Sequence, residues 1–371
     1  MKNKAGKKTD SKKTNSVLVT GGAGYVGSAL VPLLLEKGYQ VNVLDTFWFW
    51  ESTEEFVKAI NAQKAEKNSD LKIIKGDLRN IDEIKKALKG ADSVVDSVIH
   101  LACVSNDPSA DLDPKFTHSV NYDGSLNLID LSKELGVKRF IYASSSSVYG
   151  VRSEPNVTEE LEPEPITQYS KLKVEIEHYL LYRLEGDFKG VIVRPSTVCG
   201  YSPRTRLDVV VNILTNSAIN KKKIIVMGGE QLRPLIHIKD MVRLYELLLR
   251  VPIDKINKKT YNAGYGNLKV SEIANLVKEV VGDVPVEIQE TNDPRSYHVN
   301  SDKIKKELGF VPEHTIKDSV VELKKAFASG KLPDTDTKDV YYNIKRMKNI
   351  LSTKKYCNTK IVRINKLQVH N

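Results

Sequence analysis

Short apolar runs alternate with amphipathic segments along the first half of the chain. The apolar runs, bounded by polar residues, predict buried strands over 16–20, 40–45, 70–75, 93–101, 139–144 and 190–194. Between them, apolar residues recur with helical spacing and predict helices over 25–37, 81–88, 119–135 and 170–184. Strands that alternate with helices indicate an α/β fold with a Rossmann-type, doubly wound parallel sheet.

The pattern changes after about residue 195. Helical segments are predicted over 207–220, 238–250 and 271–281, with short strands over 224–227 and 260–263. We expect these elements to form a smaller mixed α/β lobe over the carboxyl ends of the sheet strands, where ligands bind in open α/β sheets. The expected division is a disordered tail over 1–15, a sheet domain over 16–195, a substrate-binding lobe over 196–333 and a loosely attached extension over 334–371.

The positive charge of the chain lies at its two ends. The formal net charge is +10, yet residues 1–16 hold six Lys and one Asp, and residues 338–371 hold nine Lys or Arg and one Asp. The segment between them is therefore slightly acidic, and solvated basic tails are a better interpretation than a nucleic-acid surface.

Composition excludes several other classes of protein. No apolar run approaches the roughly 20 residues that a membrane span needs, and the Lys-rich start lacks the apolar core of a secretory signal. The three cysteines have neither disulfide-framework nor metal-site spacing, which fits a reducing cytoplasm. We expect a cytoplasmic protein without a bound metal, whose partners include neither a membrane nor nucleic acid.

A glycine-rich turn joins the first predicted strand to the first predicted helix. Its residues fit G-x-G-x-x-G from Gly22 and also G-x-x-G-x-x-G from Gly21. Glycine lets the backbone approach a pyrophosphate, and the following helix N-terminus offers free N–H groups to the phosphates. The strand–turn–helix context supports a dinucleotide site. The cofactor-binding residues expected from this turn are Gly21, Gly24, Tyr25, Val26 and Gly27.

Two acidic residues follow the next strands. Asp45 ends the second strand, 18 residues after Gly27, where a carboxylate accepts from both adenosine ribose hydroxyls and repels a 2′-phosphate. The expected cofactor is therefore NAD rather than NADP, although Asp45 could also simply cap a strand end. Asp77 and Leu78 follow the third strand, and we expect them to contact the adenine.

A tyrosine, a lysine and a run of serines carry the candidate chemistry. Tyr169 and Lys173 are spaced i, i+4 and share one helix face. An ammonium beside a phenol lowers the pKa of the phenol, so Tyr169 could act as a general base or acid near neutral pH. The serines at 144–147 end a predicted strand and place hydroxyls at the sheet rim. In isolation, each pattern is also typical of a helix surface or a turn.

These motifs together resemble the extended short-chain dehydrogenases, specifically the NAD-dependent nucleotide-sugar epimerase/dehydratase family. The resemblance runs from about residue 16 to 328. It rests on the segments at 20–27, 76–79, 100–102, 144–150, 169–173 and 194–195, in this order and spacing.

The resemblance implies roles for particular residues. The family's catalytic hydroxyl, base and lysine match Ser145, Tyr169 and Lys173, and the last two would also contact the cofactor. Ala102 and Pro195 would line the cofactor site. Beside Ser145, the substrate would contact Thr197, Arg233 and Arg295, the arginines binding a diphosphate with their planar guanidinium groups. A structural salt bridge is the alternative for each arginine.

Ser146 and Ser147 narrow the expected activity. The family's 4,6-dehydratases carry Asp-Glu at these positions, as acid and base for water loss, and a serine hydroxyl is not a general base near neutral pH. We therefore expect a nucleotide-sugar epimerase acting at C4 through a 4-keto intermediate. A 4,6-dehydratase, a 4-keto-sugar reductase and a non-catalytic NAD-binding regulatory protein are the alternatives. The family also implies a homodimer and a role in carbohydrate biosynthesis.

Overall fold

The computed structural model describes residues 15–62, 70–91, 93–291, 296 and 298–353. The predicted disordered tail lies outside this range except for Asn15, and Arg295 lies outside it as well. Among the described residues, no helix is both long and apolar enough to cross a bilayer.

A seven-stranded parallel sheet forms the centre of the larger lobe, in the order β10-β6-β5-β4-β1-β2-β3. From β1 the chain first builds the sheet outward through β2 and β3, and then crosses to β4 on the other side of β1. The carboxyl ends of β1 and β4 therefore flank the switch point, where ligands bind. The predicted fold class is confirmed. The strands are β1 (Ser16–Thr20), β2 (Gln40–Asp45), β3 (Leu71–Lys75), β4 (Ser97–His100), β5 (Arg139–Ala143), β6 (Lys189–Pro195) and β10 (Lys259–Ala263).

Helices cover both faces of this sheet, because successive strand residues point to opposite sides. Val17 and Val19 of β1 pack on one face, whereas Leu18 packs on the other. The first face is covered by α1 (Gly27–Glu36), α2 (Thr53–Asn61), α9 (Ile238–Arg250), α10 (Ile253–Ile256) and α12 (Asp302–Leu308). The second is covered by α3 (Ile81–Leu88), α6 (Gly124–Leu135) and α7 (Gln168–Arg183), with the π-helical turn η1 (Ser119–Asp123) leading into α6.

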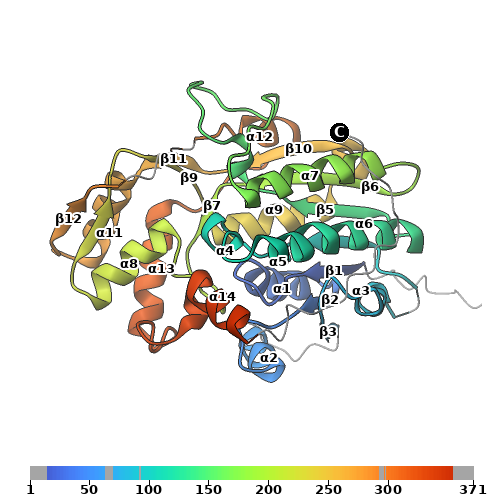
Figure 1. Ribbon diagram of the computed structural model, residues 1–371, viewed down its shortest axis with the longest axis horizontal. Helices are drawn as coiled ribbons and strands as arrows, with labels where there is room; N and C mark the ends of the chain where they lie inside the picture. Colours follow the sequence, from blue (N-terminus) through green and yellow to red (C-terminus); the bar gives the residue numbers. More distant parts are fainter. Residues whose placement is uncertain (1–14, 63–69, 92, 292–295, 297, 354–371) are drawn as a thin grey trace, which may run out of the picture.

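A smaller lobe lies beside the carboxyl ends of the strands (Figure 1). Its apolar core joins three helices to short strands. The helices are α8 (Val210–Asn220), α11 (Val270–Val281) and α13 (Ile316–Ala328). The strands form two small sheets, which are β7 (Thr197–Cys199), β9 (Leu232–His237) and β11 (Gly266–Lys269), and β8 (Ile224–Met227) with β12 (Val286–Gln289).

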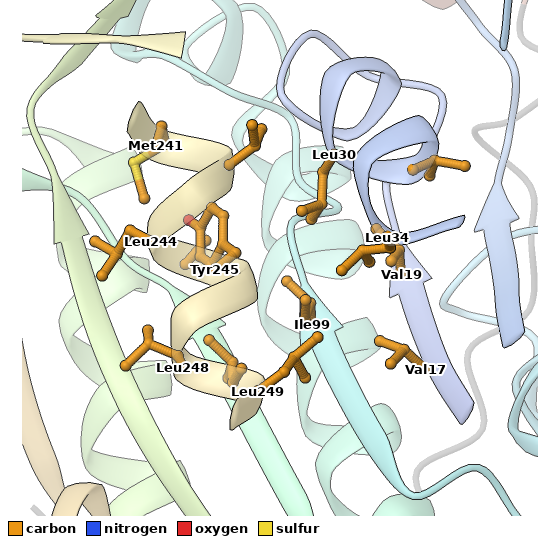
Figure 2. Close-up of a cluster of buried hydrophobic side chains, with 14 of the residues drawn as sticks. Val17, Val19, Leu30, Leu34, Ile99, Met241, Leu244, Tyr245, Leu248 and Leu249 are labelled. Atoms are coloured by element: carbon orange, nitrogen blue, oxygen red, sulfur yellow. The ribbon is translucent and has the colours of Figure 1, made fainter. Parts of the chain in front are cut away.

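Two elements expected in the smaller lobe belong to the large sheet instead. β10 pairs in parallel with β6 and forms the sheet edge, while α9 packs on the first face. Figure 2 shows apolar side chains of α9, among them Tyr245 and Leu248, beside Leu30 of α1 and Ile99 of β4. The placement of residues 238–250 and 260–263 was therefore wrong. Their local patterns were read correctly, but strand pairing and helix docking are not local properties.

The described part of the extension, residues 334–353, is packed and not loosely attached. It contains the turn η3 (Asp339–Tyr341) and the helix α14 (Asn343–Ser352), which lies between the two lobes (Figure 1). Met347 and Ile350 of α14 are buried against Trp48 and Phe116 of the larger lobe. Tyr341 packs against Leu207 of the smaller lobe, so the extension contacts both.

Candidate active site

A cavity of about 430 Å³ lies between the lobes, at the carboxyl ends of the sheet strands. All the predicted cofactor-binding and catalytic residues line it, as do Thr197 and Arg233. Residues from nearly every part of the chain therefore meet at the switch point of the sheet.

The glycine turn brings the backbone close to its neighbours. Gly21 has a φ of 71°, and a Cβ there would lie 2.7 Å from the Ala102 nitrogen. A Cβ on Gly27 would lie 2.3 Å from the Gly21 oxygen, so the first turn of α1 can pack on the loop only with glycine. Among the described residues other than its chain neighbours, a Cβ on Gly24 would meet just the Gly21 oxygen, at 3.1 Å. The cavity side of this turn is therefore open for a phosphate to approach.

Asp45 is fixed at the end of β2 with its carboxylate in the cavity wall. It accepts hydrogen bonds from the backbone N–H groups of Ala23 (2.9 Å) and Phe47 (2.8 Å). Burial raises the pKa of this carboxyl, and the two backbone donors act in the opposite direction. The bonds orient Asp45 while leaving acceptor sites free, which suits contact with ribose hydroxyls.

Asp77 and Leu78 lie together beyond β3. The Arg79 guanidinium holds the Asp77 carboxylate through two hydrogen bonds, at 2.7 and 3.0 Å. Leu78 is buried, and its Cβ lies so near Gly124 that a Cβ on that glycine would be 2.8 Å away. The two residues form a fixed wall on the same side of the cavity as Asp45.

The side chain of Tyr25 points away from the cofactor turn. Its hydroxyl donates to the Gly200 carbonyl (2.7 Å) and accepts from Asn212 of α8 (3.1 Å). Tyr25 therefore ties the start of α1 to the smaller lobe, while Val26 and the Tyr25 backbone form the helix N-terminus that faces the cavity.

Ser145, Tyr169 and Lys173 converge at the other end of the cavity. Ser145 starts the 3₁₀ turn η2 (Ser146–Tyr149), and its Oγ lies 2.8 Å from that of Ser147. Thr167 caps α7, which places Tyr169 and Lys173 on the first turns of that helix. The Lys173 Nζ donates to the Ala143 carbonyl (2.7 Å) and lies 5.6 Å from the Tyr169 ring centroid.

The surroundings of Tyr169 disfavour its charged form. Burial raises the pKa of Tyr169 well above 10, the nearby Cys103 and Asp107 act in the same direction, and a hydrogen bond with Ser145 partly opposes them. The expectation that the pKa is lowered was therefore wrong for the protein alone, because a single nearby ammonium does not offset burial.

Neighbouring residues of β6 have opposite orientations. Pro195 lines the cavity, whereas Arg194 points to the other side and forms a buried bidentate pair with Glu177 of α7, at 2.7 and 3.0 Å. Arg194 thus fixes the helix that carries Tyr169. Its role is to position α7 against the sheet, while Pro195 contacts the cavity.

The smaller lobe contributes Thr197 from β7 and Arg233 from β9. The Arg233 Nη1 donates to the Leu232 carbonyl (3.0 Å), and the adjacent Pro234 also lines the cavity. Of the two arginines predicted to bind a diphosphate, the structure therefore places Arg233 at the cavity.

The cavity fits NAD by its own geometry. The glycine turn and Asp45 suit a pyrophosphate and a ribose. At the other end, the buried hydroxyls of Ser144 and Ser196 line the cavity and have no hydrogen-bond partner among the described residues. Buried hydroxyls are normally paired, so these two are available to a bound polar group.

The sequence interpretation missed several cavity residues. Phe49, Arg204, Arg206 and Asn343 all line the cavity. The Arg-x-Arg pair after β7 was a visible signal, because two cations in a loop of this lobe suit an anionic ligand. Asn343 had no local signal, since it reaches the site from the C-terminal extension.

Residues 17–264 match the model of the NAD dependent epimerase/dehydratase family. The curated relatives include the UDP-glucose 4-epimerase of Corynebacterium glutamicum, which is 27% identical over 333 residues, covering 85% of this chain and 96% of the relative.

Solved structures share the fold. MoeE5, in complex with UDP-glucuronic acid and NAD, is 25% identical with a TM-score of 0.70, over 85% of this chain and 100% of that chain. A dTDP-glucose 4,6-dehydratase from Bacillus anthracis, in complex with NAD, is 20% identical with a TM-score of 0.75, over 88% of this chain and 100% of that chain. At that identity, the second match shows the fold alone.

Proposed function

The chain belongs to the NAD-dependent epimerase/dehydratase family, and from that premise we propose that it is an epimerase that inverts C4 of a nucleotide-diphosphate sugar. Ser145, Tyr169 and Lys173 are its proposed catalytic residues. The observation that carries the proposal is their convergence in one cavity with the glycine turn of α1.

Tyr169 removes the proton of the sugar 4-hydroxyl and returns it at the end of the cycle. Ser145 holds that hydroxyl against Tyr169, and Lys173 supplies the positive charge that favours the phenolate. NAD, when bound, would supply the reversible hydride transfer at C4 that inversion requires.

The cofactor would be held along the larger lobe. Gly21, Gly24, Tyr25, Val26 and Gly27 would bind the pyrophosphate through backbone groups. Asp45 would accept from the adenosine ribose, and Asp77 with Leu78 would contact the adenine. Ala102 and Pro195 would border the nicotinamide half of the cofactor.

The substrate would lie between the lobes. Thr197 and Arg233 face the cavity from the smaller lobe, and Arg233 would bind the diphosphate, together with Arg295. The names of the relatives support this class of substrate, since UDP-glucose and UDP-glucuronic acid occur among them.

Ser146 and Ser147 favour epimerisation over loss of water. Ser147 donates its backbone N–H to the Ser145 Oγ (3.1 Å), and the side chain of Ser146 is buried. Neither hydroxyl is a general acid or base near neutral pH, and dehydration needs both.

A panel of nucleotide sugars tests the proposal. The natively purified protein is denatured and its released nucleotide identified by mass spectrometry, and UDP-, GDP-, dTDP- and CDP-sugars are incubated with the protein without added cofactor. Bound NAD, with one sugar converted to an isomer of equal mass, is the expected result. A product lighter by the mass of water would instead indicate a dehydratase. A sugar that is oxidised or reduced only when NAD(H) is added would indicate a reductase. Bound NAD without turnover of any sugar would indicate a regulatory protein.

Replacing Tyr169 by Phe tests the catalytic assignment. The change removes one hydroxyl, so we expect kcat to fall by about 10²- to 10⁴-fold, the usual contribution of a general acid–base group. The NAD content of the purified variant should stay the same. Turnover near that of the unchanged protein would contradict the role of Tyr169.

The wider setting is also part of the proposal. We place the enzyme in the cytoplasm, in carbohydrate biosynthesis, and assembled as a homodimer in which α6 and α7 of both copies form a four-helix interface. Tyr182 of α7 is 70% exposed and Leu135 of α6 is 43% exposed, which supports an apolar contact there. Residues 16–195, with α9 and β10, would hold NAD, and most of 196–333 would hold the sugar nucleotide.

A further inference from the structure

Arg204 is a buried cation in the wall of the cavity. It follows β7, only 5% of its surface is exposed, and its guanidinium carbon lies 3.7 Å from the centroid of the Phe49 ring. Its Nη2 donates to the Asn343 Oδ1 (2.5 Å), and its Nε has no hydrogen-bond partner among the described residues. A buried N–H group of a cation without an acceptor is costly, so this geometry suits a ligand that accepts.

The position of Arg204 is on the cofactor side of the cavity. Its backbone N–H donates to the Ser28 Oγ (3.1 Å) in the first turn of α1. Its charge interacts favourably with the Asp45 carboxylate at the end of β2. The pyrophosphate and the adenosine ribose of a dinucleotide bind between these two elements.

The charge of Arg204 has no dedicated counterion. Burial, and then the neighbouring Arg206, lower the pKa of the Arg204 guanidinium to about 9, and the attraction of Asp208 and Asp45 only partly opposes this. Arg206 is paired with Asp208, at 2.5 Å, whereas no ion pair joins Arg204 to any carboxylate in the described part of the chain. An anion that enters the cavity would therefore be attracted to Arg204.

Asn343, the first residue of α14, holds Arg204 in place. Its Oδ1 accepts from Arg204, its Nδ2 donates to the Ser105 Oγ (2.7 Å), and its backbone N–H donates to the Asp208 Oδ2 (2.7 Å). One buried side chain thus connects the C-terminal extension to the loops after β4 and β7. The burial of Met347 and Ile350 keeps α14 in this position.

We propose that Arg204 binds the pyrophosphate of NAD and that Asn343 positions it, so that the C-terminal extension is part of the cofactor site. A sugar nucleotide also carries a pyrophosphate. The cofactor is favoured because Arg204 lies beside α1, Asp45 and Phe49, whereas Arg233 reaches the cavity from β9. The inference depends on the NAD site and not on which sugar is the substrate.

Calorimetric titration of the full-length protein, freed of nucleotide, separates the two sources of pyrophosphate. The probes are ADP-ribose, adenosine and UDP. The variants are Arg204→Met, Arg204→Lys and Asn343→Ala, with Arg250→Met, 60% exposed on α9, and Asn349→Ala, elsewhere on α14, as matched controls. Thermal melting of each variant checks that it is folded, and Arg204→Lys keeps the comparison possible if Arg204→Met does not fold.

We expect the substitutions to weaken the binding of ADP-ribose selectively. Arg204→Met should weaken the binding of ADP-ribose by about 10- to 100-fold, the range for a charge-assisted hydrogen bond. The affinities for adenosine and for UDP should change by less than about threefold. Arg204→Lys should lose less affinity for ADP-ribose than Arg204→Met, and Asn343→Ala should lose about three- to tenfold. Both control variants should bind ADP-ribose as the unchanged protein does. Equal losses for adenosine and ADP-ribose, no loss for either, or a loss confined to UDP would each overturn the proposal.

Discussion

Burial and several neighbouring groups determine how readily the Tyr169 phenol ionises, and Arg206 and Ser145 are among those that lower its pKa. Burial has the largest effect and raises its pKa, and the nearby Cys103 and Asp107 act in the same direction. The Lys173 Nζ lies 5.6 Å from the ring centroid and favours the phenolate by its charge. The charges of Lys173 and Asp107 can each be removed by substitution, so their separate effects on the pKa of Tyr169 can be measured.

Opposite shifts of the pH profile are expected when these charges are removed one at a time. Because Tyr169 reacts as the phenolate, log kcat should rise with pH up to the pKa of Tyr169 in the bound state. Lys173→Met removes a cation, raises that pKa and moves the rise to higher pH. Asp107→Asn removes an anion, lowers the pKa and moves the rise to lower pH. Each shift should be about 0.5 to 2 pH units, measured from pH 5 to 10.

Asp107→Asn is a mild change because an amide oxygen can still accept from the Thr167 Oγ1, which lies 2.5 Å from the Asp107 carboxylate. The cap of α7 should therefore persist. Shifts of both variants in the same direction would show that the profile reports another group.

At the scale of single elements, the local hydrophobic pattern was informative. The predicted bounds of β2, α3 and α9 match the structure to the residue. The strand predicted over 93–101 is shorter, because β4 starts only at Ser97 and Val94 pairs with Lys89 instead. The helix predicted over 119–135 starts with the π-helical turn η1. Ends and turn types depend on contacts that the local pattern does not contain.

The pair of Arg194 and Glu177 anchors α7 to β6, and breaking it should destabilise the fold. Both side chains are at most 6% exposed, so Arg194→Met would leave a buried carboxylate without its partner. We expect the free energy of unfolding to fall by about 3 to 5 kcal/mol, measured by denaturant titration. Lys138→Met is the control, because the Lys138–Asp187 pair is 60% and 86% exposed and such surface pairs contribute little to stability. Similar losses in both variants would contradict an anchoring role.

At the scale of the whole molecule, the site is assembled from distant parts of the chain. The glycine turn, Tyr169 and Lys173 could be predicted because each is a motif on a single element. Arg204 had a visible signal in the Arg-x-Arg pair, but Asn343 could not be predicted, since its contact with Arg204 joins residues 139 positions apart and exists only after both lobes have formed. The same reason explains α9 and β10, whose local patterns do not reveal the sheet that they join. Long-range packing, rather than local sequence, completes the cavity.

Two truncations test whether the C-terminal extension belongs to the folded enzyme. Removing 354–371 leaves α14 whole, so NAD content and turnover should change by less than about twofold. Removing 338–371 deletes η3 and α14 and exposes Trp48 and Phe116, which α14 covers. Loss of the buried Met347 and Ile350 alone should cost about 3 to 6 kcal/mol of unfolding free energy. Bound NAD should also fall, because Asn343 is removed from the cavity. Thermal melting and released NAD measure both effects, and equal behaviour of the two truncations would mean that α14 contributes to neither.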